Sequence, residues 1–519
     1  MRKIVLLFSV IIIGYFSHAK DYNISDFGAK GDGVVLNTAI IQGAIDFITT
    51  HGGGRLVFNE GIYLTGSIYL KSNVVLHLEE NAVLLGSVNP LDYIKDSYIG
   101  WMSMVFALKQ ENIGITGKGM IDGRGFYTAN NQVANIHKKI FTDPLKLDRP
   151  NETNRPQNVY FRECRNIVIK GITLKDPASW NQTYDQCKNL YVDSIKVDSK
   201  NYWNNDGIDV VDCDGVVIKN SFFDAADDVI CFKSHDPTKI CENVIVDNCT
   251  GRSSANGLKF GTVSRGGFRN FKVTNLTIYD TYRSAITFAA VDGGIIENIL
   301  VDGVKSTNTG NVIYLRIGDR WSGGKKPAMN NVVIRNVYAE VPNGKPDSGY
   351  LYEGPVEDLP RNISPCGIVG LPQYKIKNVT LENITIVYPG GSNPNYAYRG
   401  LKKAELDSIP EMPAAYPEFS QFKELPAWGF YLRHAEDINF KNITLIAGKK
   451  EYRPAIVADD VKNISFEKVE FQEPDSRKKK QVFLQNSTQV KKKKHTQIIK
   501  DESHKNIDYR FYSPVLVIG

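Results

Sequence analysis

Residues 166–174 read NIVIKGITL, and this phrase decides the fold because it recurs along most of the chain. Each copy opens on Asn, Asp or Gly and contains two short β-rich segments around a polar or small residue. Between residues 166 and 298 the copies begin 23 to 28 residues apart, and insertions separate the later ones. The other copies are NLYVDSIKV (189–197), GVVIKNSFF (215–223), NVIVDNCTG (243–251), NFKVTNLTI (270–278), NILVDGVKS (298–306), NVVIRNVYA (331–339), NVTLENITI (378–386), DINFKNITL (437–445) and NISFEKVEF (463–471).

A repeat of this length, with β-branched residues at alternating positions, predicts a solenoid of strands. The leucine signature of leucine-rich repeats is missing from the copies. We therefore predict an all-β fold, a right-handed parallel β-helix whose neighbouring coils lie about 4.8 Å apart. The Asn that opens most copies is expected to stack in a turn and to hydrogen-bond the backbone.

One stretch has helical rather than strand periodicity. Residues 37–54, NTAIIQGAIDFITTHGGG, carry apolar residues at helical spacing and end on three Gly. We predict a short N-terminal helix that stops at these Gly and caps the open end of the solenoid, where edge strands would otherwise be unpaired.

The 519 residues divide into three predicted parts. Arg2 and Lys3 precede an apolar run, 4–16, and a small-residue cleavage site, 17–19, which is the order of a signal peptide. We predict a signal peptide over 1–19 and a secreted or periplasmic protein, with an N-terminal membrane anchor as the alternative. Residues 20–476 are predicted to form the β-helix, and 477–519 a Lys-rich C-terminal tail in which the β-helix could end.

Charge and cysteine usage exclude several classes of protein. The net charge is +6, and much of the positive charge lies in RKKK (477–480) and KKKK (491–494), which we interpret as a solvated tail. We predict no nucleic-acid partner and no stable membrane insertion. The seven Cys form no CxxC pair, which argues against a zinc site and a disulfide framework. We expect most of them to be buried, with one or two disulfides left open.

Carboxylates concentrate in residues 204–234, NNDGIDVVDCDGVVIKNSFFDAADDVICFKS. Asp206 precedes Asp227 by 21 residues and Asp228 by 22, which is close to one coil. We therefore expect these three side chains to stack on adjacent coils, and Asp209 to reach the same face through an irregular turn.

Converging carboxylates suit calcium binding, glycoside hydrolysis or structural turns. An inverting glycosidase separates its acid and base by about 6.5–9.5 Å. Crowding helps such an enzyme because repulsion keeps one carboxyl protonated near neutral pH. Lys233 directly follows the group and disfavours a cation cage. We predict hydrolysis, with no metal and no organic cofactor.

These motifs make the chain resemble glycoside hydrolase family 28, the inverting pectinases that include polygalacturonases and rhamnogalacturonases. The resemblance covers nearly the whole chain after residue 19. It begins with ISDFGAKGDGVVLNTAIIQGAID and GGGRLVFNEGIYLTGSIYLKSNVVLHLEENAVLLGS (52–87), and continues with SWNQTYDQCKNLYV (179–192). Asn204-Asn205-Asp206 is similar to the family's Asn-Thr-Asp motif, and Asp227-Asp228 to its Asp-Asp motif.

The resemblance implies roles for these residues. Asp227 would be the general acid, and Asp206 and Asp228 would position and deprotonate the attacking water. Asn204 would support the substrate or the acid. Asp209 is a further substrate-binding candidate because it is expected on the same face.

Two family motifs are missing here. Asn256 stands where the family's Gly-His-Gly has its His, and 286–288, Ile-Thr-Phe, stands where it has Arg-Ile-Lys. A neutral sugar or a differently placed uronate therefore fits better than plain polygalacturonate. The replacement cations and other substrate-binding candidates, of which Lys259 is the strongest, are Lys233, Asn256, Lys259, Arg283, Arg316 and Arg320.

The predicted function is that of an exported, inverting glycoside hydrolase acting on an acidic pectic oligosaccharide or polysaccharide, of the galacturonate or rhamnogalacturonan type. The insertion 387–429 lacks the repeat and is expected to wall the binding site, which favours action on chain ends. Two alternatives remain: a polysaccharide lyase on the same fold, and a non-catalytic glycan-binding β-helix. The lyase would need an Arg or Lys base beside the Asp pair.

Overall fold

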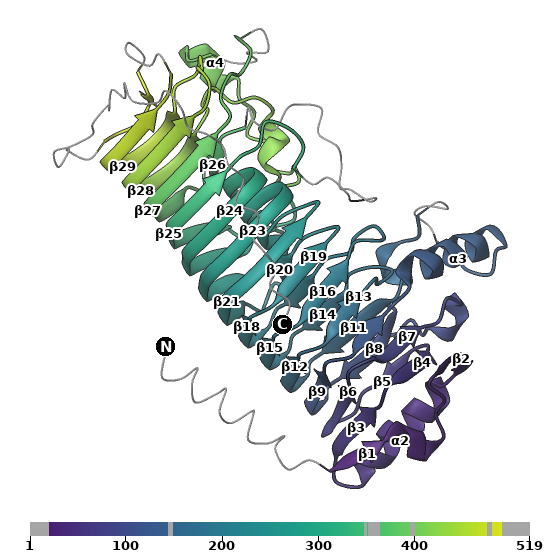
Figure 1. Ribbon diagram of the computed structural model, residues 1–519. Helices are drawn as coiled ribbons and strands as arrows, with labels where there is room; N and C mark the ends of the chain where they lie inside the picture. Colours follow the sequence, from purple (N-terminus) through teal and green to yellow (C-terminus); the bar gives the residue numbers. More distant parts are fainter. Residues whose placement is uncertain are drawn as a thin grey trace, which may run out of the picture.

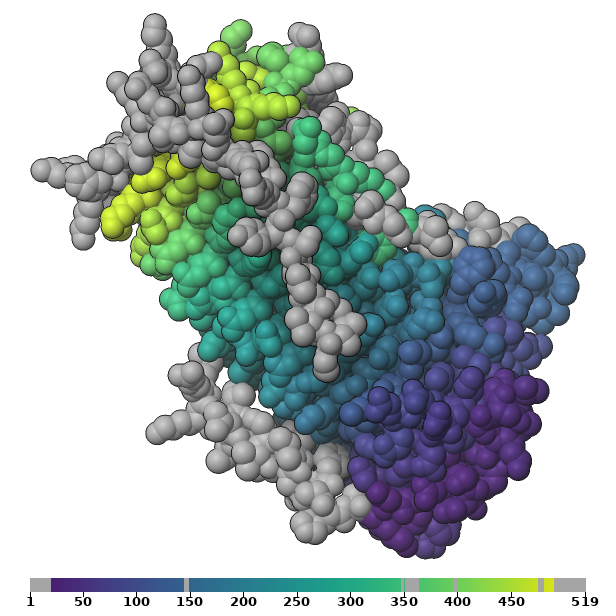
Figure 2. All heavy atoms as spheres, in the orientation of Figure 1, coloured from purple at the N-terminus to yellow at the C-terminus, as the bar shows by residue number. Residues whose placement is uncertain are grey.

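The computed structural model describes residues 20–143, 149–346, 350, 364–394, 400–474 and 480–489. The predicted signal peptide, 1–19, and residues 490–519 of the predicted tail lie outside the described residues. The described coils form one elongated body that runs from the N-terminal to the C-terminal end (Figures 1 and 2).

The strands stack in parallel, each pairing with the strand one coil away, as in a parallel β-helix. The fold is nearly all β, as predicted. In the first coils the strands are short and form three series. The first series is β1 (Asp21–Asn23), β3 (Gly54–Phe58), β6 (Val74–Leu78), β9 (Glu111–Gly117), β12 (Arg165–Lys170), β15 (Lys188–Asp193) and β18 (Asp214–Lys219).

The other two series run beside the first. One consists of β2 (Asp32–Leu36), β4 (Gly61–Thr65), β7 (Ala82–Gly86), β10 (Met120–Asp122), β13 (Thr173–Lys175), β16 (Lys196–Ser199) and β19 (Phe222–Ala225). The other consists of β5 (Ile68–Tyr69), β8 (Ser103–Leu108), β11 (Gln157–Arg162), β14 (Gln182–Asp185), β17 (Ile208–Val211), β20 (Ile230–Ser234) and β22 (Leu258–Ser264).

Later coils merge these series into long strands that bend around the solenoid. They are β21 (Cys241–Ser253), β23 (Gly267–Ala290), β24 (Ile295–Ile317), β25 (Ala328–Glu340), β27 (Ile376–Tyr388), β28 (Phe430–Ala447) and β29 (Ile456–Gln472). The short strand β26 (Cys366–Val369) lies between β24 and β28 and pairs with both. A last strand, β30 (Val482–Gln485), pairs with β29, so the β-helix continues beyond residue 476 into the predicted tail.

The helical elements are few and lie outside the stacked strands. Among the described residues, no helix combines the length and hydropathy needed to cross a membrane. The helices are α2 (Thr38–Thr50), α3 (Gly125–His137) and α4 (Lys403–Asp407), with the 3-10 turns η1 (Ile24–Phe27), η2 (Pro90–Asp92), η3 (Glu152–Asn154) and η6 (Phe419–Phe422).

Helix α2 lies at the N-terminal end of the solenoid (Figure 1). It falls within the stretch predicted to be helical and buries one apolar face, formed by Ile41, Ala44, Ile45 and Ile48. The helix ends at Thr50, and Gly52 and Gly53 follow with φ values of 94° and 88°. The backbone N–H of Gly53 donates to the carbonyl of Ile48. Because Gly adopts such φ values at no steric cost, the Gly run turns the chain away from the helix.

The core is a column of side chains inside the coils. Residues of one register stack on adjacent coils, as Phe232, Phe260 and Phe288 do, with ring centroids 5.3 Å and 4.3 Å apart. All seven Cys are buried free thiols, as expected for small apolar core residues.

The Asn residues that open the repeats form ladders, although in a different way from the one expected. They do stack, but the amides bond to one another: the Nδ2 of Asn270 donates to Asn243 Oδ1, and that of Asn298 to Asn270 Oδ1, each at 3.2 Å. These residues have left-handed φ values of 57° to 60°, which Asn tolerates better than most residues. Gly215 takes the equivalent position one coil before Asn243, with a φ of 74°.

We expect Asn270→Ala to lower the free energy of unfolding by about 2 kcal/mol, because a side chain that disfavours the left-handed region replaces one that tolerates it and two ladder bonds are lost. Asn270→Gly loses the same bonds but relieves the backbone, so its loss should be about 1 kcal/mol. Urea unfolding of both variants measures this. Equal losses for Ala and Gly would contradict the backbone contribution.

Candidate active site

The predicted acidic residues converge on the outer face of the third strand series. Asp209 on β17, Cys231 on β20 and Lys259 on β22 stand in one register row, and the residues that follow them point into the core. Asp206 and the pair Asp227-Asp228 lie in the turns before β17 and β20. These turns stack, because Asp227 N–H donates to the carbonyl of Asn205, 3.2 Å away.

Lys233 binds two of the carboxylates. Its Nζ lies 2.5 Å from Asp209 Oδ1 and 3.2 Å from Asp206 Oδ2, and all three residues are at most 4% exposed. The second oxygens, Asp206 Oδ1 and Asp209 Oδ2, have no hydrogen-bond partner among the described residues. Burial raises the pKa of Asp209 to about 6 although Lys233 opposes the shift, and burial together with Asp209 raises the pKa of Asp206 well above its ordinary range.

Asp228 has a different environment. Its Oδ1 accepts hydrogen bonds from the backbone and side-chain N–H groups of Asn256 at 3.1 and 2.9 Å, and its Oδ2 lies 2.8 Å from Lys259 Nζ. Burial alone would raise the pKa of Asp228, but Lys259 and Lys233 outweigh it and hold this pKa below its ordinary value. Asn256 also accepts from Ser284 N–H through its Oδ1, so it ties Asp228 to the next coil.

Asp227 is the most accessible carboxyl of the group. It is half-buried, whereas Asp206, Asp209 and Asp228 are buried. Asn204 Nδ2 lies 3.5 Å from Asp227 Oδ2 and is also half-buried. Burial and the neighbouring Asp228 raise the pKa of Asp227. Two adjacent carboxyls in the chain therefore have pKa values shifted in opposite directions.

Two arginines, the buried Arg155 and the half-buried Arg149, bind the side chain of Asn204. Arg155 and Arg149 each donate to Asn204 Oδ1 at 2.8 Å, which fixes the amide so that its N–H groups face Asp227. Arg155 also donates to the carbonyls of Ala178 and Trp203. The sequence motifs contained no sign of either arginine, because both come from the segment before β11.

A distant segment completes the group on its C-terminal side. Tyr416 accepts a hydrogen bond from Lys259 Nζ at 2.9 Å, and Glu418 Oε1 lies 2.8 Å from Arg283 Nη1. Both residues belong to the insertion 387–429, predicted to wall the site, but neither was singled out from the sequence. Their only signal was their place in a non-repeating, Pro-rich loop. Of the aromatics in this loop, Trp428 is in the core, and Tyr398 lies outside the described residues.

The two other predicted arginines have structural partners. Arg316 donates to the carbonyls of Val369, Gly370 and Met412. Arg320 makes two bonds to Asp292, at 2.8 and 3.2 Å, and its guanidinium lies 3.8 Å from the ring centroid of Trp321. The structure thus brings Lys233, Lys259 and Arg283 to the carboxylates and pairs Arg316 elsewhere. Arg320 is paired with Asp292, and its guanidinium also lies 5.7 Å from the ring centroid of Tyr416, which binds Lys259.

Aromatic rings lie on the N-terminal side of the carboxylates. Lys233 Nζ is 4.1 Å from the ring centroid of Trp180, a cation–π distance, and Trp180 packs against Trp101 at 4.6 Å. Both Trp are half-buried.

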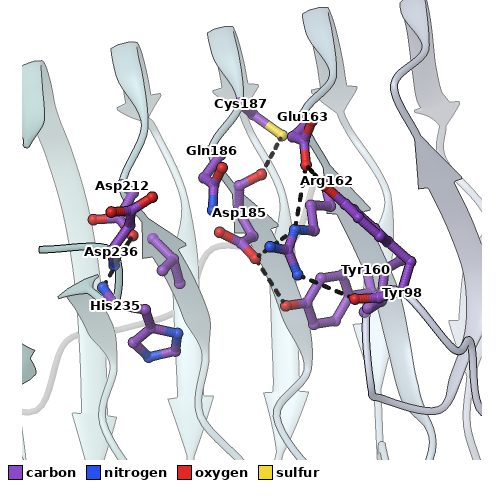
Figure 3. A network of polar contacts seen from close by, with 12 residues as sticks. Tyr98, Tyr160, Arg162, Glu163, Asp185, Gln186, Cys187, Asp212, His235 and Asp236 are labelled. Atoms are coloured by element: carbon purple, nitrogen blue, oxygen red, sulfur yellow. Dashed lines mark hydrogen bonds and ion pairs between the residues drawn. The ribbon is translucent and has the colours of Figure 1, made fainter. Parts of the chain in front are cut away.

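A second polar network extends the same face of the sheet (Figure 3). Arg162, Asp185 and Lys233 stand in one register row across β11, β14 and β20. Asp185 Oδ2 lies 3.2 Å from Tyr160 Oη and 3.4 Å from Arg162 Nε.

At the far end of that network, Asp212 holds the turn after β20. Its Oδ2 accepts the backbone N–H groups of His235 and Asp236, and its Oδ1 accepts from Ser234 Oγ. Burial raises the pKa of Asp212 to about 6 and lowers that of His235 to about 4, so His235 is neutral at pH 7. At this end of the network, Asp212 therefore holds the backbone of His235 and Asp236 in place.

The carboxylate group is poorly suited to a metal ion. Asp206, Asp228 and Cys231 each bring a potential ligand atom within 4.8 Å of the others. However, Lys233 Nζ already lies 3.2 Å from Asp206 Oδ2 and from Cys231 Sγ, and Lys259 is paired with Asp228. Two ammonium groups would repel a divalent cation, and burial raises the pKa of the Cys231 thiol.

Comparison with known proteins shows a family match over the part of the chain that contains the carboxylate group. Residues 64–285 match the family model "Glycosyl hydrolases family 28". An exo-poly-alpha-D-galacturonosidase from Dickeya chrysanthemi is 30% identical over 253 residues, which are 41% of this chain and 42% of that enzyme. This chain thus spans less than half the length of that relative.

Two solved structures resemble the whole fold. An exopolygalacturonase from Thermotoga maritima has a TM-score of 0.56 at 23% identity and covers 74% of this chain and 91% of its own. A family 28 exopolygalacturonase from Yersinia enterocolitica has a TM-score of 0.53 at 21% identity, over 90% of this chain and 77% of its own. At these identities the two structures show the fold alone.

Proposed function

Because this chain belongs, through residues 64–285, to glycosyl hydrolases family 28, we propose that it hydrolyses a glycosidic bond in a pectic oligosaccharide or polysaccharide. The observation that carries the proposal is the opposite pKa shift of Asp227 and Asp228. Neighbouring carboxyls whose pKa values are pushed apart supply the acid and the base that glycoside hydrolysis needs.

In this proposal Asp227 is the general acid. Its raised pKa favours the protonated carboxyl, and its partial exposure lets the proton reach the glycosidic oxygen. Asn204 donates toward Asp227 Oδ2 and orients the carboxyl. As the bond breaks, the departing sugar takes the proton and Asp227 becomes a carboxylate, which Arg283 and Lys259 then stabilise.

Asp228 is the proposed base. Lys259 and Asn256 keep it ionised, so it can take a proton from the water that attacks the anomeric carbon. Asp206 has an oxygen within 4.8 Å of one of Asp228, close enough for both to hold one water. Because the pKa of Asp206 is raised, Asp206 positions this water and Asp228 deprotonates it.

The substrate class and the site of action are also proposals. The Dickeya relative is named for removing galacturonate units from the ends of chains, which suggests a pectic substrate here. Tyr416 and Glu418 cover the C-terminal side of the carboxylates and favour action on chain ends. We further propose that the protein is exported, because residues 1–19 contain basic residues, an apolar run and a small-residue cleavage site in the order typical of a signal peptide.

The products test the reaction class. A rhamnogalacturonan fragment and oligogalacturonate would be incubated with the protein, and proton NMR would follow the anomer formed first. We expect a saturated sugar whose anomeric configuration is opposite to that of the bond cut. A product absorbing in the unsaturated-uronate band would instead indicate a lyase, and binding without product would indicate a glycan-binding protein.

A further inference from the structure

The three cations beside the acid and the base each have an acidic or phenolic partner from the protein. Lys233 is bound to Asp209, and Lys259 to Asp228 and Tyr416. Arg283 is bound to Glu418. We propose that Glu418 is a specificity-determining residue, which neutralises Arg283 so that the sugar beside Asp227 and Asp228 is neutral rather than a uronate.

Arg283 is the cation that a uronate would otherwise meet. It is 4% exposed, and its backbone N–H donates to the carbonyl of Ala255 at 2.8 Å, directly before Asn256, which binds Asp228. Lys233 and Lys259 are bound to catalytic-side carboxylates on their own or adjacent coils. Arg283 instead takes its counter-ion from a segment 135 residues away. Removal of Glu418 would therefore free one positive charge beside the reacting bond.

Glu418 is built into the site and is not a surface ion pair. Its side chain is 12% exposed, and that of Arg283 is 5% exposed. Glu418 Oε2 and Arg283 Nε have no hydrogen-bond partner among the described residues. In such a place the attraction between opposite charges is stronger than at the surface, and a carboxylate without a cationic partner is strongly disfavoured.

The charge balance then decides which sugar the site accepts. Three cations face Asp209, Asp228 and Glu418, and Asp206 and Asp227 add further acidic groups. A uronate carboxylate would enter a site with no excess of positive charge and lose its hydration there. A hydroxymethyl group in the same position carries no such penalty, and the remaining N–H groups of Arg283 are suitable donors to sugar hydroxyls.

The test compares two trisaccharides that have the same linkages and ring configuration and differ only in the group at C6. They are α-1,4-trigalacturonate and its carboxyl-reduced form, in which each carboxylate is a hydroxymethyl group. Calorimetry would measure binding to Asp227→Asn protein, which cannot turn the ligands over if the proposed function is right. We expect the reduced trisaccharide to bind at least 10-fold more tightly than trigalacturonate.

Glu418→Gln in the same background isolates the ion pair, because the amide oxygen can still accept from Arg283 while the charge is gone. We expect trigalacturonate to gain at least 10-fold in affinity and the reduced form to change less than 3-fold. The double variant Arg283→Gln/Glu418→Gln has no freed cation, so the gain should vanish. Glu411→Gln is the matched control, since Glu411 lies in the same segment but pairs with Arg433 and His434.

The inference rests on the proposed function only for the choice of site, and the two can fail separately. Equal or tighter binding of trigalacturonate by the unmodified Glu418 background would overturn it, as would binding of neither ligand. The inference would also be overturned if Glu418→Gln left the ratio of the two ligand affinities unchanged. If the Glu418→Gln protein does not fold, the ratio of the two ligand affinities in the protein that retains Glu418 still tests the inference. Product analysis of the wild-type protein tests hydrolysis independently.

Discussion

Asp227→Asn is expected to lower kcat about 1000-fold on a natural pectic substrate, while the protein stays folded. General acid catalysis contributes roughly 10²- to 10⁴-fold, and a 1000-fold loss corresponds to about 4 kcal/mol of transition-state stabilisation. The amide has the shape of the protonated carboxyl but cannot donate a proton to the departing oxygen. Because burial and Asp228 raise the pKa of Asp227, the neutral amide removes a cost of the folded state and should not weaken it.

Substrates with different leaving groups distinguish a general acid from a residue that only supports the structure of the site. A substrate with a p-nitrophenol leaving group needs little protonation, so Asp227→Asn should slow it much less, by about 10-fold or under. Asp212→Asn is the matched control: it replaces a buried carboxyl just after β17, and the amide can still accept from His235 N–H. It should leave kcat within twofold. Equal losses on both substrates would contradict the assignment of Asp227 as the acid.

The stacking of the Asp residues could be predicted because it depends only on period and register. Once the repeat sets the coil length, residues 21 or 22 apart must lie on adjacent coils, and the bond between Asp227 N–H and the carbonyl of Asn205 follows. The same logic predicted the parallel strands and the stacking of the Asn residues. The family resemblance rested on these motifs, and the match over 64–285 confirmed it.

The partners of the cations could not be predicted, because they come from loops without a period. Tyr416 lies 157 residues from Lys259 in sequence, and no repeat sets where its loop crosses the coils. For the same reason Arg316 and Arg320 looked like substrate ligands: a sequence shows a charge but not its partner. Asp292, which binds Arg320, stands in a turn between repeats, with nothing in the pattern to mark it.

The pKa directions also required the structure. From spacing alone, Asp206 and Asp228 were equivalent candidates for activating water. Their difference comes from Lys259 and Asn256, which both contact Asp228, while Asp206 shares Lys233 with Asp209. Asn256 stands where the resemblance led us to expect a His, and its amide binds the carboxylate of Asp228 without titrating itself.

Lys233→Met should be the most destabilising of the single changes considered, lowering the free energy of unfolding by about 3–5 kcal/mol at neutral pH. Removing one member of a buried ion pair leaves an uncompensated charge, which has this cost. Here two carboxylates, Asp206 and Asp209, would lose the same ammonium group. Lys377→Met is the control, because Lys377 is exposed and its surface pair with the half-buried Glu436 should contribute less than about 1 kcal/mol.

The loss should depend on pH in a known direction. Burial already raises the pKa of Asp209 to about 6, and without Lys233 the pKa values of Asp209 and Asp206 would rise further. The folded variant therefore binds more protons than the unfolded chain from about pH 4 up to these raised values, so its stability falls as the pH rises through that range. Denaturant unfolding at pH 4.5 and pH 8 should show the larger deficit at pH 8. A deficit that is the same at both pH values, or below 1 kcal/mol, would mean that Lys233 does not lower the pKa values of Asp209 and Asp206.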